Sequence, residues 1–397
     1  MAKYPSRCGS SPVSLLKILH CPTSTGGHPW GLSRAERRLG LESVSAVFSR
    51  DYLDYPCDLY LYDKKDPKII QQAKCWRYLF HAARKFDIIH YNYGLGLLPW
   101  GFTERWVGKN NPGRHGFRLY TRICEFVERS LLGSKVIVVT FQGDDARQGD
   151  YCLQNFSLSI AHACPGVYYS PGQDQLNRKK ILCFDEKADL IYALNPDLLR
   201  VLPRRARYLP YAHLCPREVV VAQKAVGSKP LIVHAPTHRQ VKGTQHIIEA
   251  VSRLQREGIS CELALVEKKH HRDAMKIYEQ ADLMVDQLWA GWYGGFAVEA
   301  MALGKPVIGY IRREDLSRIP ESMARELPVI QATPDSIGQV LKEWLTIRKK
   351  DLSAWGLRGR AFIKKWHDPD RIADSVRQDY LGALQQKRNI RKTKLTP

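Results

Sequence analysis

The strongest structural signal of the chain lies in Gly291-Trp-Tyr-Gly-Gly-Phe-Ala-Val-Glu-Ala-Met-Ala-Leu-Gly-Lys-Pro-Val307. A glycine-rich turn leads into a short helix, and Gly304 ends that helix before a strand. The free N–H groups and the positive dipole end at the start of such a helix suit a phosphate. Glu299, one to two turns further on, can accept hydrogen bonds from vicinal sugar hydroxyls. An ordinary strand–helix–strand unit would also carry glycine at both ends, so the stretch alone leaves both interpretations open.

A second loop places two cations close together between a predicted strand and a predicted helix. It reads His234-Ala-Pro-Thr-His-Arg-Gln-Val-Lys-Gly243, with Arg239 and Lys242 as the cations. Arginine and lysine beside a helix N-terminus are suited to hold a diphosphate. A solvent-facing basic loop would have the same composition.

Short apolar segments alternate with helical ones along most of the chain, which is typical of βαβ units and a parallel sheet. A helix is expected over residues 244–257, where apolar residues fall on one face and Gly258 follows as a stop. The predicted strands are residues 14–20, 87–90, 135–140, 188–193, 230–234, 261–266, 281–285 and 306–310.

The length of 397 residues suggests two or three domains at roughly 150 residues each. Residues 201–230 are rich in proline and arginine and have weak periodicity, so we interpret them as a bridge. The sequence predicts an α/β fold of two Rossmann-like domains that face each other across a central cleft. The domains are residues 1–210 and 211–370, and a helix in residues 371–397 is expected to pack back on the first domain.

Polar loops also follow the strands of the N-terminal half. Gly26 and Gly27 lie after the first strand and allow close backbone approach to a bound group, although the spacing is not that of a dinucleotide fingerprint. His90-Tyr-Asn92 and Phe141-Gln-Gly-Asp-Asp-Ala-Arg147 follow two further strands. A lone polar residue after a strand is more often structural. Several of them at the carboxyl ends of one parallel sheet favour a ligand site.

The charge balance narrows the class of partner. The chain has 61 Lys and Arg against 40 Asp and Glu, a formal net charge of +21. A basic surface attracts nucleic acid, anionic lipid or phosphorylated small molecules. No zinc finger, helix-turn-helix or RNA-binding motif supports nucleic acid. The basic run at residues 387–394 is equally typical of a solvated chain end.

Cysteine usage and hydropathy bear on location. The ten cysteines are scattered without a Cys-x-x-Cys pair, so we expect reduced thiols and no metal site. No stretch approaches the ~18–20 apolar residues of a membrane-spanning helix. Residues 13–19 are too interrupted for a secretory signal. These features predict a cytoplasmic protein.

Taken together, the motifs resemble a known family. Arg-x-x-Lys-Gly after a strand, followed roughly fifty residues later by Gly-x4-Glu-Ala-Met-Ala-x-Gly-Lys-Pro-Val, resembles the group 1 retaining glycosyltransferases of the GT-B fold, the GT4 family. The spacing fits over residues 228–375. The N-terminal half is similar in a looser way, through Gly26-Gly27, Asp87-Ile-Ile-His90 and Thr140-Phe-Gln-Gly-Asp144.

The resemblance implies a nucleotide-sugar donor bound by the C-terminal domain. Arg239 and Lys242 match the diphosphate-binding pair of the family, and Glu299 matches the second glutamate of its Glu-x7-Glu motif, which holds the ribose. The transferred sugar would lie against the backbone amides of the loop 293–296. Further donor-binding residues implied are Gly26, Gly27, Tyr293, Gly294, Gly295 and Phe296.

The chain departs from the family pattern at three positions. Gly291 stands where the family has its first glutamate, which contacts the donor sugar, and Asp286 and Gln287 are candidates to replace it. Asn92 holds the second place of a His-x-His motif, and we count it among the catalytic residues with Arg239, Lys242 and Glu299. A histidine of the family is replaced by Gln142, so that the acceptor-side residues are His90, Gln142 and Asp144.

The reaction implied is sugar transfer with retention, without a metal or another cofactor, in the synthesis of a cell-surface polysaccharide or glycolipid. The acceptor would be a glycan or a lipid-linked molecule. Peripheral association with the inner face of an anionic membrane is expected through Arg34, Arg37 and Arg38. Gly291 and Gln142 keep open a non-catalytic nucleotide-sugar-binding subunit, and a sugar-nucleotide epimerase is the other enzyme considered.

Overall fold

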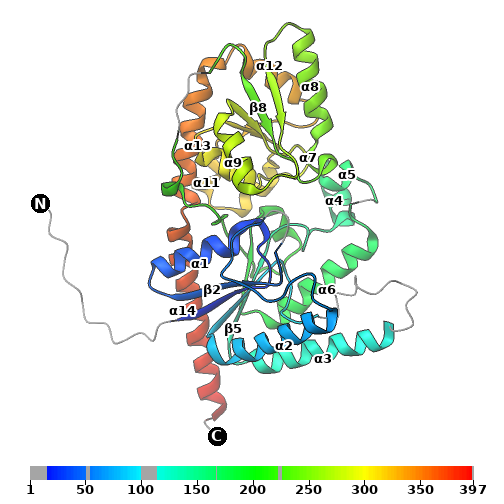
Figure 1. Ribbon diagram of the computed structural model, residues 1–397, viewed down its shortest axis with the longest axis vertical. Coiled ribbons are helices and arrows are strands. Elements are labelled where there is room, and N and C mark those ends of the chain that lie inside the picture. Colours follow the sequence, from blue (N-terminus) through cyan, green and yellow to red (C-terminus); the bar gives the residue numbers. More distant parts are fainter. Residues whose placement is uncertain (1–15, 51–53, 100–113, 167, 222–225, 396–397) are drawn as a thin grey trace, which may run out of the picture.

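The computed structural model describes residues 16–50, 54–99, 114–166, 168–221 and 226–395. Two parallel sheets, one in each half of the chain, form the centres of two α/β units that lie one above the other in Figure 1. Three parts of the sequence analysis lie outside the described residues. They are the first residues of the predicted strand 14–20, the part of the interrupted stretch that precedes Leu16, and Cys8.

The N-terminal sheet has seven strands in the order β3-β2-β1-β4-β5-β6-β7, and all its pairings are parallel. The central strands β4 and β5 are buried along their whole length, as expected of strands covered on both faces. The strands are β1 Lys17–Cys21, β2 Glu42–Val47, β3 Leu59–Tyr60, β4 Ile88–Asn92, β5 Val136–Phe141, β6 Leu190–Ala193 and β7 Arg207–Tyr208.

The C-terminal sheet has five parallel strands in the order β12-β11-β10-β8-β9. Helix α8 covers it with Ile247, Val251 and Leu254, the residues that the sequence places on one helix face. The strands are β8 Leu231–His234, β9 Glu262–Leu265, β10 Leu283–Val285, β11 Val307–Gly309 and β12 Ile330–Gln331.

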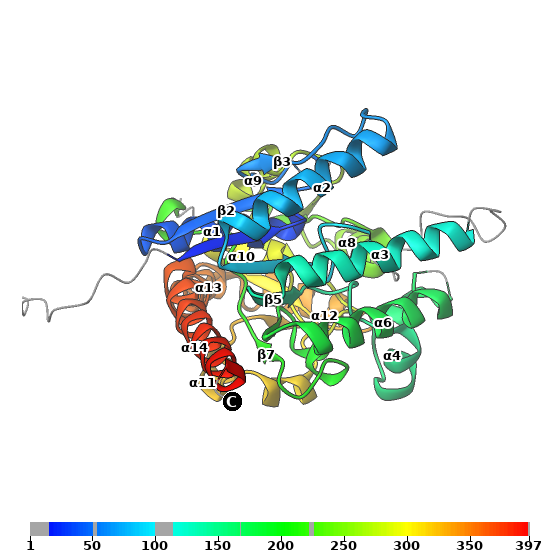
Figure 2. The same cartoon turned by 90° about the horizontal axis from the view of Figure 1, so that it is seen from below.

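Helices cover both sheets (Figures 1 and 2). Those of the N-terminal half are α1 His28–Arg38, α2 Lys68–Lys85, α3 Arg114–Leu132, α4 Gly149–Asn155, α5 Ile160–Ala163 and α6 Pro171–Lys187. Those that follow are α7 Arg239–Lys242, α8 Thr244–Arg256, α9 His271–Gln280, α10 Gly295–Ala302, α11 Glu321–Glu326, α12 Ile337–Leu345, α13 Leu352–Trp366 and α14 Pro369–Leu395. Short 3-10 turns cover Thr25–Gly27, Pro196–Arg200, Pro216–Glu218, Arg313–Arg318 and Lys349–Asp351.

The predicted alternation of strands and helices, and the two parallel sheets, are confirmed. Each of the eight predicted strands contains or overlaps an observed one, namely β1, β4, β5, β6, β8, β9, β10 and β11. The sequence did not indicate β2, which alternates serine with apolar residues, nor β3, β7 and β12, which have two residues each. The predicted C-terminal helix is observed as α14, Pro369–Leu395.

Three features join the two halves. Helix α14 follows α13 and packs against α1, on the N-terminal half (Figure 1). An apolar cluster brings Val241 and Ala290 of the C-terminal half together with Ile160 and Cys164 of the N-terminal half. The chain between β7 and β8 passes close to α1, since the backbone N–H of Ala212 donates to the His28 ring at 3.1 Å.

Within the described residues, no helix is long and apolar enough to cross a membrane. The cysteines of this part of the chain are all free thiols. The same residues contain no group of His, Cys, Asp or Glu side chains that could hold a metal ion.

Candidate functional site

Strand order marks where a ligand can bind in each sheet. In the C-terminal sheet, β9 lies on the outer side of β8, while β11 and β12 lie on the outer side of β10, in the opposite direction. In the N-terminal sheet, β2 and β3 lie on the outer side of β1, while β5, β6 and β7 lie on the outer side of β4. Ligands of open parallel sheets bind outside the carboxyl ends of the strands at such switch points. Lys242 and Asp286 follow β8 and β10, while Gly27 follows β1 and Asn92 ends β4.

Lys242 ties together the loops at the C-terminal switch point. Its Nζ lies 2.6 Å from Gln287 Oε1 and 3.3 Å from Asp286 Oδ1. The other oxygen of Asp286 accepts a hydrogen bond from the Gly294 backbone N–H at 2.7 Å. Asp286 and Gln287 are the candidates to replace the missing glutamate. Their polar atoms are engaged with Lys242 and the start of α10, so they hold both in place.

Arg239 lies one turn earlier on α7 and points toward a different strand. Its guanidinium makes a two-pronged ion pair with Glu267, just after β9, with N–O distances of 2.8 and 2.6 Å. The arginine side chain is 58% exposed. Exposed pairs of this kind contribute little free energy, so an incoming anion can replace Glu267 as the partner of Arg239.

Glu299 is a buried carboxylate that two histidines contact at the same oxygen. His271 Nε2, at the start of α9, donates to Oε1 at 2.7 Å, and His213 Nε2 lies 3.5 Å from that oxygen. Burial raises the pKa of the Glu299 carboxyl, but the contacts with His213 and His271 outweigh burial and lower the pKa to about 2. Among the described residues none donates to Oε2, which is therefore left to accept hydrogen bonds from a ligand.

His213 belongs to the chain that connects the two halves, and it brings them together at Glu299. A Cβ added at Gly295 would lie 3.6 Å from its Nε2, and one added at Gly27 would lie 3.4 Å from its Cβ. Gly27 has a φ of +68° and would also come within 2.9 Å of the Tyr55 ring. The glycine loop after β1, the start of α10 and Glu299 thus surround one imidazole. Gly26, with a φ of +60°, adjoins open space.

Gly291 has a structural reason to be glycine. Its φ is +77°, and an added Cβ would lie 2.6 Å from the Arg312 guanidinium carbon. Arg312 is buried, bonds to Asp315 at 3.0 Å and stacks 3.6 Å from the centre of the Phe156 ring. The space that a glutamate at position 291 would occupy is therefore taken by Arg312.

The side chains of the loop 293–296 face the core. The Tyr293 hydroxyl lies 2.8 Å from His367 Nε2 in a buried contact, and the Phe296 ring packs 5.0 Å from the ring of Tyr278. The backbone N–H of Gly294 already serves Asp286. The Tyr293 side chain therefore has a structural role, while the predicted sugar cradle, which uses backbone amides of the loop 293–296, stays a prediction.

On the N-terminal side, Asn92 and Gln142 lie together. Gln142 Nε2 donates to Asn92 Oδ1 at 3.3 Å, and Asn195 donates to the Gln142 carbonyl at 2.5 Å. Asn92 is buried, and its own amide donates to the His90 carbonyl at 3.1 Å. The two residues that replace family histidines thus contact each other.

His90 lies inside the N-terminal half. Its Nδ1 lies 2.6 Å from the Tyr380 hydroxyl of α14, and its Nε2 lies 2.6 Å from Thr140 Oγ1. Burial, with the nearby His20 and His28, lowers the pKa of His90 well below its ordinary value. Both ring nitrogens of His90 are therefore engaged, one of them by α14, and its predicted place on the acceptor side stays a prediction.

Asp144 is also engaged. It accepts hydrogen bonds from the hydroxyls of Tyr168 and Tyr169, both at 2.5 Å, and from Arg147 at 3.3 Å. The Tyr168 ring packs 5.2 Å from the His238 ring of the C-terminal half. Asp144 therefore supports a contact between the two halves, and its predicted role toward an acceptor stays a prediction.

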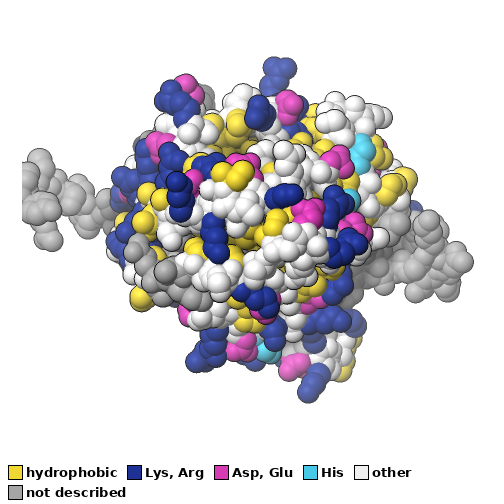
Figure 3. Space-filling view, turned by 90° about the horizontal axis from the view of Figure 1, so that it is seen from above, with side chains coloured by type: hydrophobic (Ala, Val, Ile, Leu, Met, Phe, Trp, Pro, Cys, Tyr) yellow, Lys and Arg dark blue, Asp and Glu magenta, His cyan; other side chains and the backbone are white. Residues whose placement is uncertain are grey.

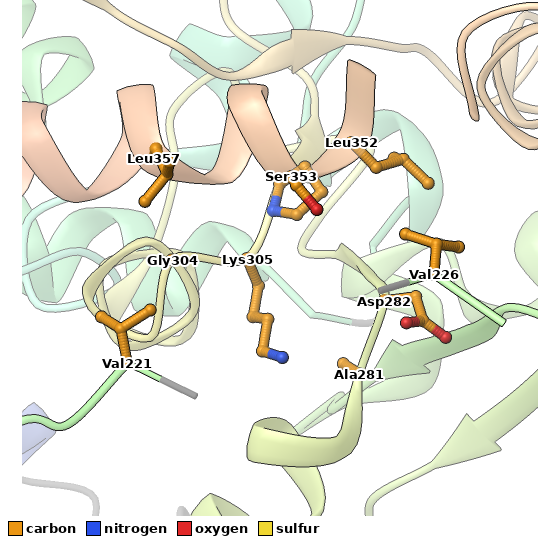
Figure 4. A pocket seen from close by; sticks show the side chains of 10 residues that line it. Val221, Val226, Ala281, Asp282, Gly304, Lys305, Leu352, Ser353 and Leu357 are labelled. Carbon is orange, nitrogen blue, oxygen red and sulfur yellow. The ribbon is translucent and has the colours of Figure 1, made fainter. Parts of the chain in front are cut away.

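The sequence analysis missed His213 and His271, because neither lies in one of the motifs from which the site was predicted. A cavity of about 30 Å³ lies elsewhere, between Lys305, Asp282 and Ser353 (Figure 4). Asp282 precedes β10 and Lys305 precedes β11, so this cavity is at the amino ends of the strands and outside the candidate site.

No protein-family model matches the chain, and no curated protein matches it in sequence. Solved structures match in three dimensions. Sucrose-phosphate synthase from Thermosynechococcus elongatus is 15% identical with a TM-score of 0.58, and the match covers 94% of this chain and 100% of that one. HepE from Anabaena, in complex with UDP-glucose, is 11% identical with a TM-score of 0.58 over 91% and 98% of the two chains.

The catalytic domain of starch synthase IV from Arabidopsis thaliana, bound to ADP and acarbose, is 12% identical with a TM-score of 0.57, covering 94% of this chain and 100% of that one. The chain has the GT-B fold. The GT-B prediction is therefore confirmed.

Proposed function

We propose that this GT-B protein is a retaining glycosyltransferase of the GT4 type, which moves a sugar from a nucleoside-diphosphate donor to a hydroxyl acceptor. One observation carries the proposal. A buried, ionised carboxylate, Glu299, lies on the same short helix whose N-terminus faces Lys242, and one of its oxygens is left for a ligand. The neighbours of the fold include proteins whose structures contain UDP-glucose or ADP.

In this proposal, the ribose hydroxyls donate to Glu299 Oε2, while His213 and His271 hold Oε1. The diphosphate lies at the N-terminus of α10, where the helix dipole, Lys242 and Arg239 neutralise the charge that develops on the leaving group. Lys242 is held by Asp286 before the donor binds, so little reorganisation is needed. These cations do the work that a divalent metal would do, and we propose that none is required.

The acceptor side is proposed to include Asn92 and Gln142, which end neighbouring strands of the N-terminal sheet. We propose a glycan or lipid-linked acceptor in the synthesis of a cell-surface polysaccharide or glycolipid, with the enzyme in the cytoplasm at the membrane surface. The arginines expected to meet the membrane are paired: Arg34 with Glu218 at 3.0 Å, Arg37 with Asp58 at 2.8 Å and Arg38 with Asp370 at 2.7 Å.

A second function, a non-catalytic nucleotide-sugar-binding subunit, is favoured by one observation. Arg312 fills the space beside Gly291, so no carboxylate can reach a donor sugar from that position. Such a protein would bind the nucleotide-sugar without consuming it. An epimerase would interconvert two nucleotide-sugars without any acceptor.

The experiment is calorimetric titration with UDP, GDP and ADP in the presence of EDTA, followed by incubation with the matching nucleotide-sugars and NMR analysis of the products. Micromolar binding of one nucleotide and a product with the anomeric configuration of the donor support the proposal. Binding without turnover favours the subunit, and a changed nucleotide-sugar favours the epimerase. Failure of all three nucleotides to bind contradicts the proposed donor site.

A further inference from the structure

Tyr93 directly follows β4 and has a backbone conformation that tyrosine rarely adopts. Its φ is +63°, and that of the next residue, Gly94, is +54°. Two left-handed residues in succession are usually Asn-Gly or Asp-Gly, because a bulky side chain is strained in this conformation. In the part of the chain that the structure describes, the other non-glycine residues with a positive φ are Asp54 and Lys268. Tyr93 is therefore the bulky, aromatic exception among the three.

The turn at Tyr93 is fixed by its surroundings. The backbone N–H of Tyr93 donates to the carbonyl of Thr140, in β5, at 3.1 Å. A Cβ added at Gly94 would lie 2.6 Å from Lys180 Cδ and 2.9 Å from Phe141 Cε1, so a side chain at position 94 would displace both. Local preference would place asparagine or aspartate at position 93, and the chain has tyrosine instead. A residue that stays strained against local preference points to a use of its side chain.

The hydroxyl of Tyr93 keeps hydrogen-bonding capacity that the protein does not use. The side chain is half-buried, and within the described residues no group bonds to its hydroxyl. Burial, together with the nearby carboxylates of Asp145 and Asp144, raises the pKa of the phenol, so the phenol keeps its proton at neutral pH. Both carboxylates have other donors: Asp144 accepts from two tyrosine hydroxyls, and Asp145 accepts from two backbone N–H groups of the loop after β5.

A second unused polar atom lies nearby, on Gln142. The Gln142 amide nitrogen donates to Asn92 Oδ1 at 3.3 Å, and among the described residues none donates to Gln142 Oε1. Tyr93 follows Asn92 in the chain. An unused donor and an unused acceptor of hydrogen bonds therefore lie beside Asn92, at the ends of the neighbouring strands β4 and β5.

We propose that Tyr93 binds the acceptor together with Gln142, and that this acceptor is a sugar. The reacting hydroxyl has to face the donor, so groups beside it serve the hydroxyls next to it on the same molecule. A sugar ring carries such neighbouring hydroxyls, each of which donates and accepts, whereas a simple alcohol carries none. The Tyr93 hydroxyl donates to one of them, and Gln142 Oε1 accepts from another. The inference rests on the proposed function and deepens it by naming the class of acceptor.

Surface charge gives no comparable indication of an acceptor site. Figure 3, which views the molecule from above its C-terminal half, shows Lys and Arg side chains with Asp and Glu side chains among them. The arginines of α1 are engaged in ion pairs. We therefore expect hydrogen bonds, rather than charge, to select the acceptor, which agrees with an uncharged sugar.

The test is saturation-transfer difference NMR of the full-length protein with the methyl glycosides of glucose, galactose, mannose and N-acetylglucosamine, with and without UDP, GDP or ADP. Cyclohexanol, a ring with one hydroxyl, is the comparison probe. We expect at least one glycoside to bind and cyclohexanol to bind more weakly. Tyr93→Phe, which removes only the hydroxyl, should weaken glycoside binding about threefold to tenfold. Tyr78→Phe, in a half-buried tyrosine of α2, is the matched control and should bind as the original does.

A second variant separates binding from folding. Asparagine is suited to a left-handed backbone, so Tyr93→Asn should keep or raise the free energy of unfolding, measured with urea, while it loses glycoside binding. A purely structural tyrosine would give the opposite result: a lower free energy of unfolding and unchanged glycoside binding.

Three results would overturn the inference: no glycoside binds, cyclohexanol binds as tightly as the glycosides, or Tyr93→Phe binds them as the original does. Calorimetry with the nucleotides separates this test from the proposed function. Nucleotide binding without glycoside binding contradicts the role of Tyr93. Glycoside binding without nucleotide binding contradicts the proposed function instead. A Tyr93→Phe variant with unchanged nucleotide affinity shows an intact donor site.

Discussion

The loop edges of the two sheets face each other, and they use similar polar residues in opposite ways. At the C-terminal edge, Glu299 is held through one oxygen while the other remains for a ligand. At the N-terminal edge, His90 has both ring nitrogens bonded, and Asp144 accepts hydrogen bonds from two tyrosines and an arginine.

This difference teaches how to tell a ligand-binding polar residue from a structural one at the end of a strand. Position after a strand is common to both edges. What distinguishes them is the hydrogen-bonding capacity that remains once the protein's own partners are satisfied. Glu299 keeps part of its capacity in a buried place, where an unpaired polar atom is costly. The predictions below test this distinction, in order of their expected effect on donor binding.

Replacing Glu299 should have the largest effect. Glu299→Ala removes the proposed acceptor of the ribose hydroxyls and leaves His213 and His271 without the carboxylate, so we expect at least about a tenfold loss of nucleotide affinity and of turnover. Calorimetry and a transfer assay measure the two losses, and circular dichroism checks the fold. Glu262→Ala is the matched control, since Glu262 is exposed and lies at the amino end of β9. Normal activity of a folded Glu299→Ala protein would falsify the assignment.

Removing the two cations should come next. The double variant Arg239→Ala with Lys242→Ala should bind a nucleoside diphosphate about tenfold more weakly, because charge-assisted hydrogen bonds to the phosphates are lost. Lys242→Ala alone should account for most of the change, since Lys242 is fixed by Asp286 whereas Arg239 is exposed. The binding of the nucleoside, which lacks phosphates, serves as the control. Unchanged diphosphate affinity would place the clamp elsewhere.

Changing a positioning histidine should have a smaller effect. His213→Ala should raise the KM for the donor by about threefold to fivefold and leave kcat nearly unchanged, because an interaction common to the ground state and the transition state is weakened. His213→Asn keeps an N–H donor and should restore part of the affinity. His81→Ala, in an exposed histidine of α2, is the control. A fall in kcat with constant KM would contradict a positioning role.

Disturbing the N-terminal network should leave donor binding unchanged. Tyr380→Phe removes the hydroxyl that lies beside His90 Nδ1 and donates to Glu36 at 3.2 Å, so the free energy of unfolding should fall by about 1–3 kcal/mol. Urea unfolding measures the loss, and calorimetry below the transition measures nucleotide affinity. A fall in nucleotide affinity along with stability would contradict the distinction between a ligand-binding C-terminal loop edge and a structural N-terminal network.

Lowering the pH should destabilise the protein first through its buried histidines. Burial lowers the pKa of His28 and His367 to about 3 and that of His234 to about 4. Below pH 6.5 these histidines bind protons in the unfolded chain but stay neutral in the folded chain. The free energy of unfolding should therefore decrease as the pH falls, by up to about 1.4 kcal/mol per pH unit for each histidine. Glu299 stays ionised down to about pH 2. Urea unfolding at pH 7, 6 and 5 measures the slope, and a flat profile would contradict it.

Local patterns allowed prediction of the two sheets and suggested part of the candidate site. Lys242 and Glu299 were proposed as site residues because each lies in a short motif whose spacing fixes its place on a loop or helix. β2 was missed because Ser43 and Ser45 look solvent-exposed in the sequence, whereas both are buried, and Ser43 donates to Glu36 of α1. A buried serine paired across elements leaves no periodic signal.

Contacts between distant residues could not be predicted. His90 was assigned to the acceptor side because nothing near it indicates Tyr380, which follows 290 residues later and takes its Nδ1. His213 and His271 were missed for the same reason. Their role depends on how the chain between β7 and β8 and the start of α9 come to lie beside Glu299, and only the folded arrangement of both halves determines that.

The position of His213 links the contacts of Glu299 to the arrangement of the two halves. The stretch Tyr211–His213 is bound to α1, through Ala212 and His28, and moves with the N-terminal half. Glu299 moves with the C-terminal half. The distance between His213 Nε2 and Glu299 Oε1, which is 3.5 Å, therefore depends on how closely the two halves approach each other. Separating the halves would remove this contact and leave His271 as the partner of Oε1, so that any donor affinity that depends on His213 is coupled to the angle between the halves.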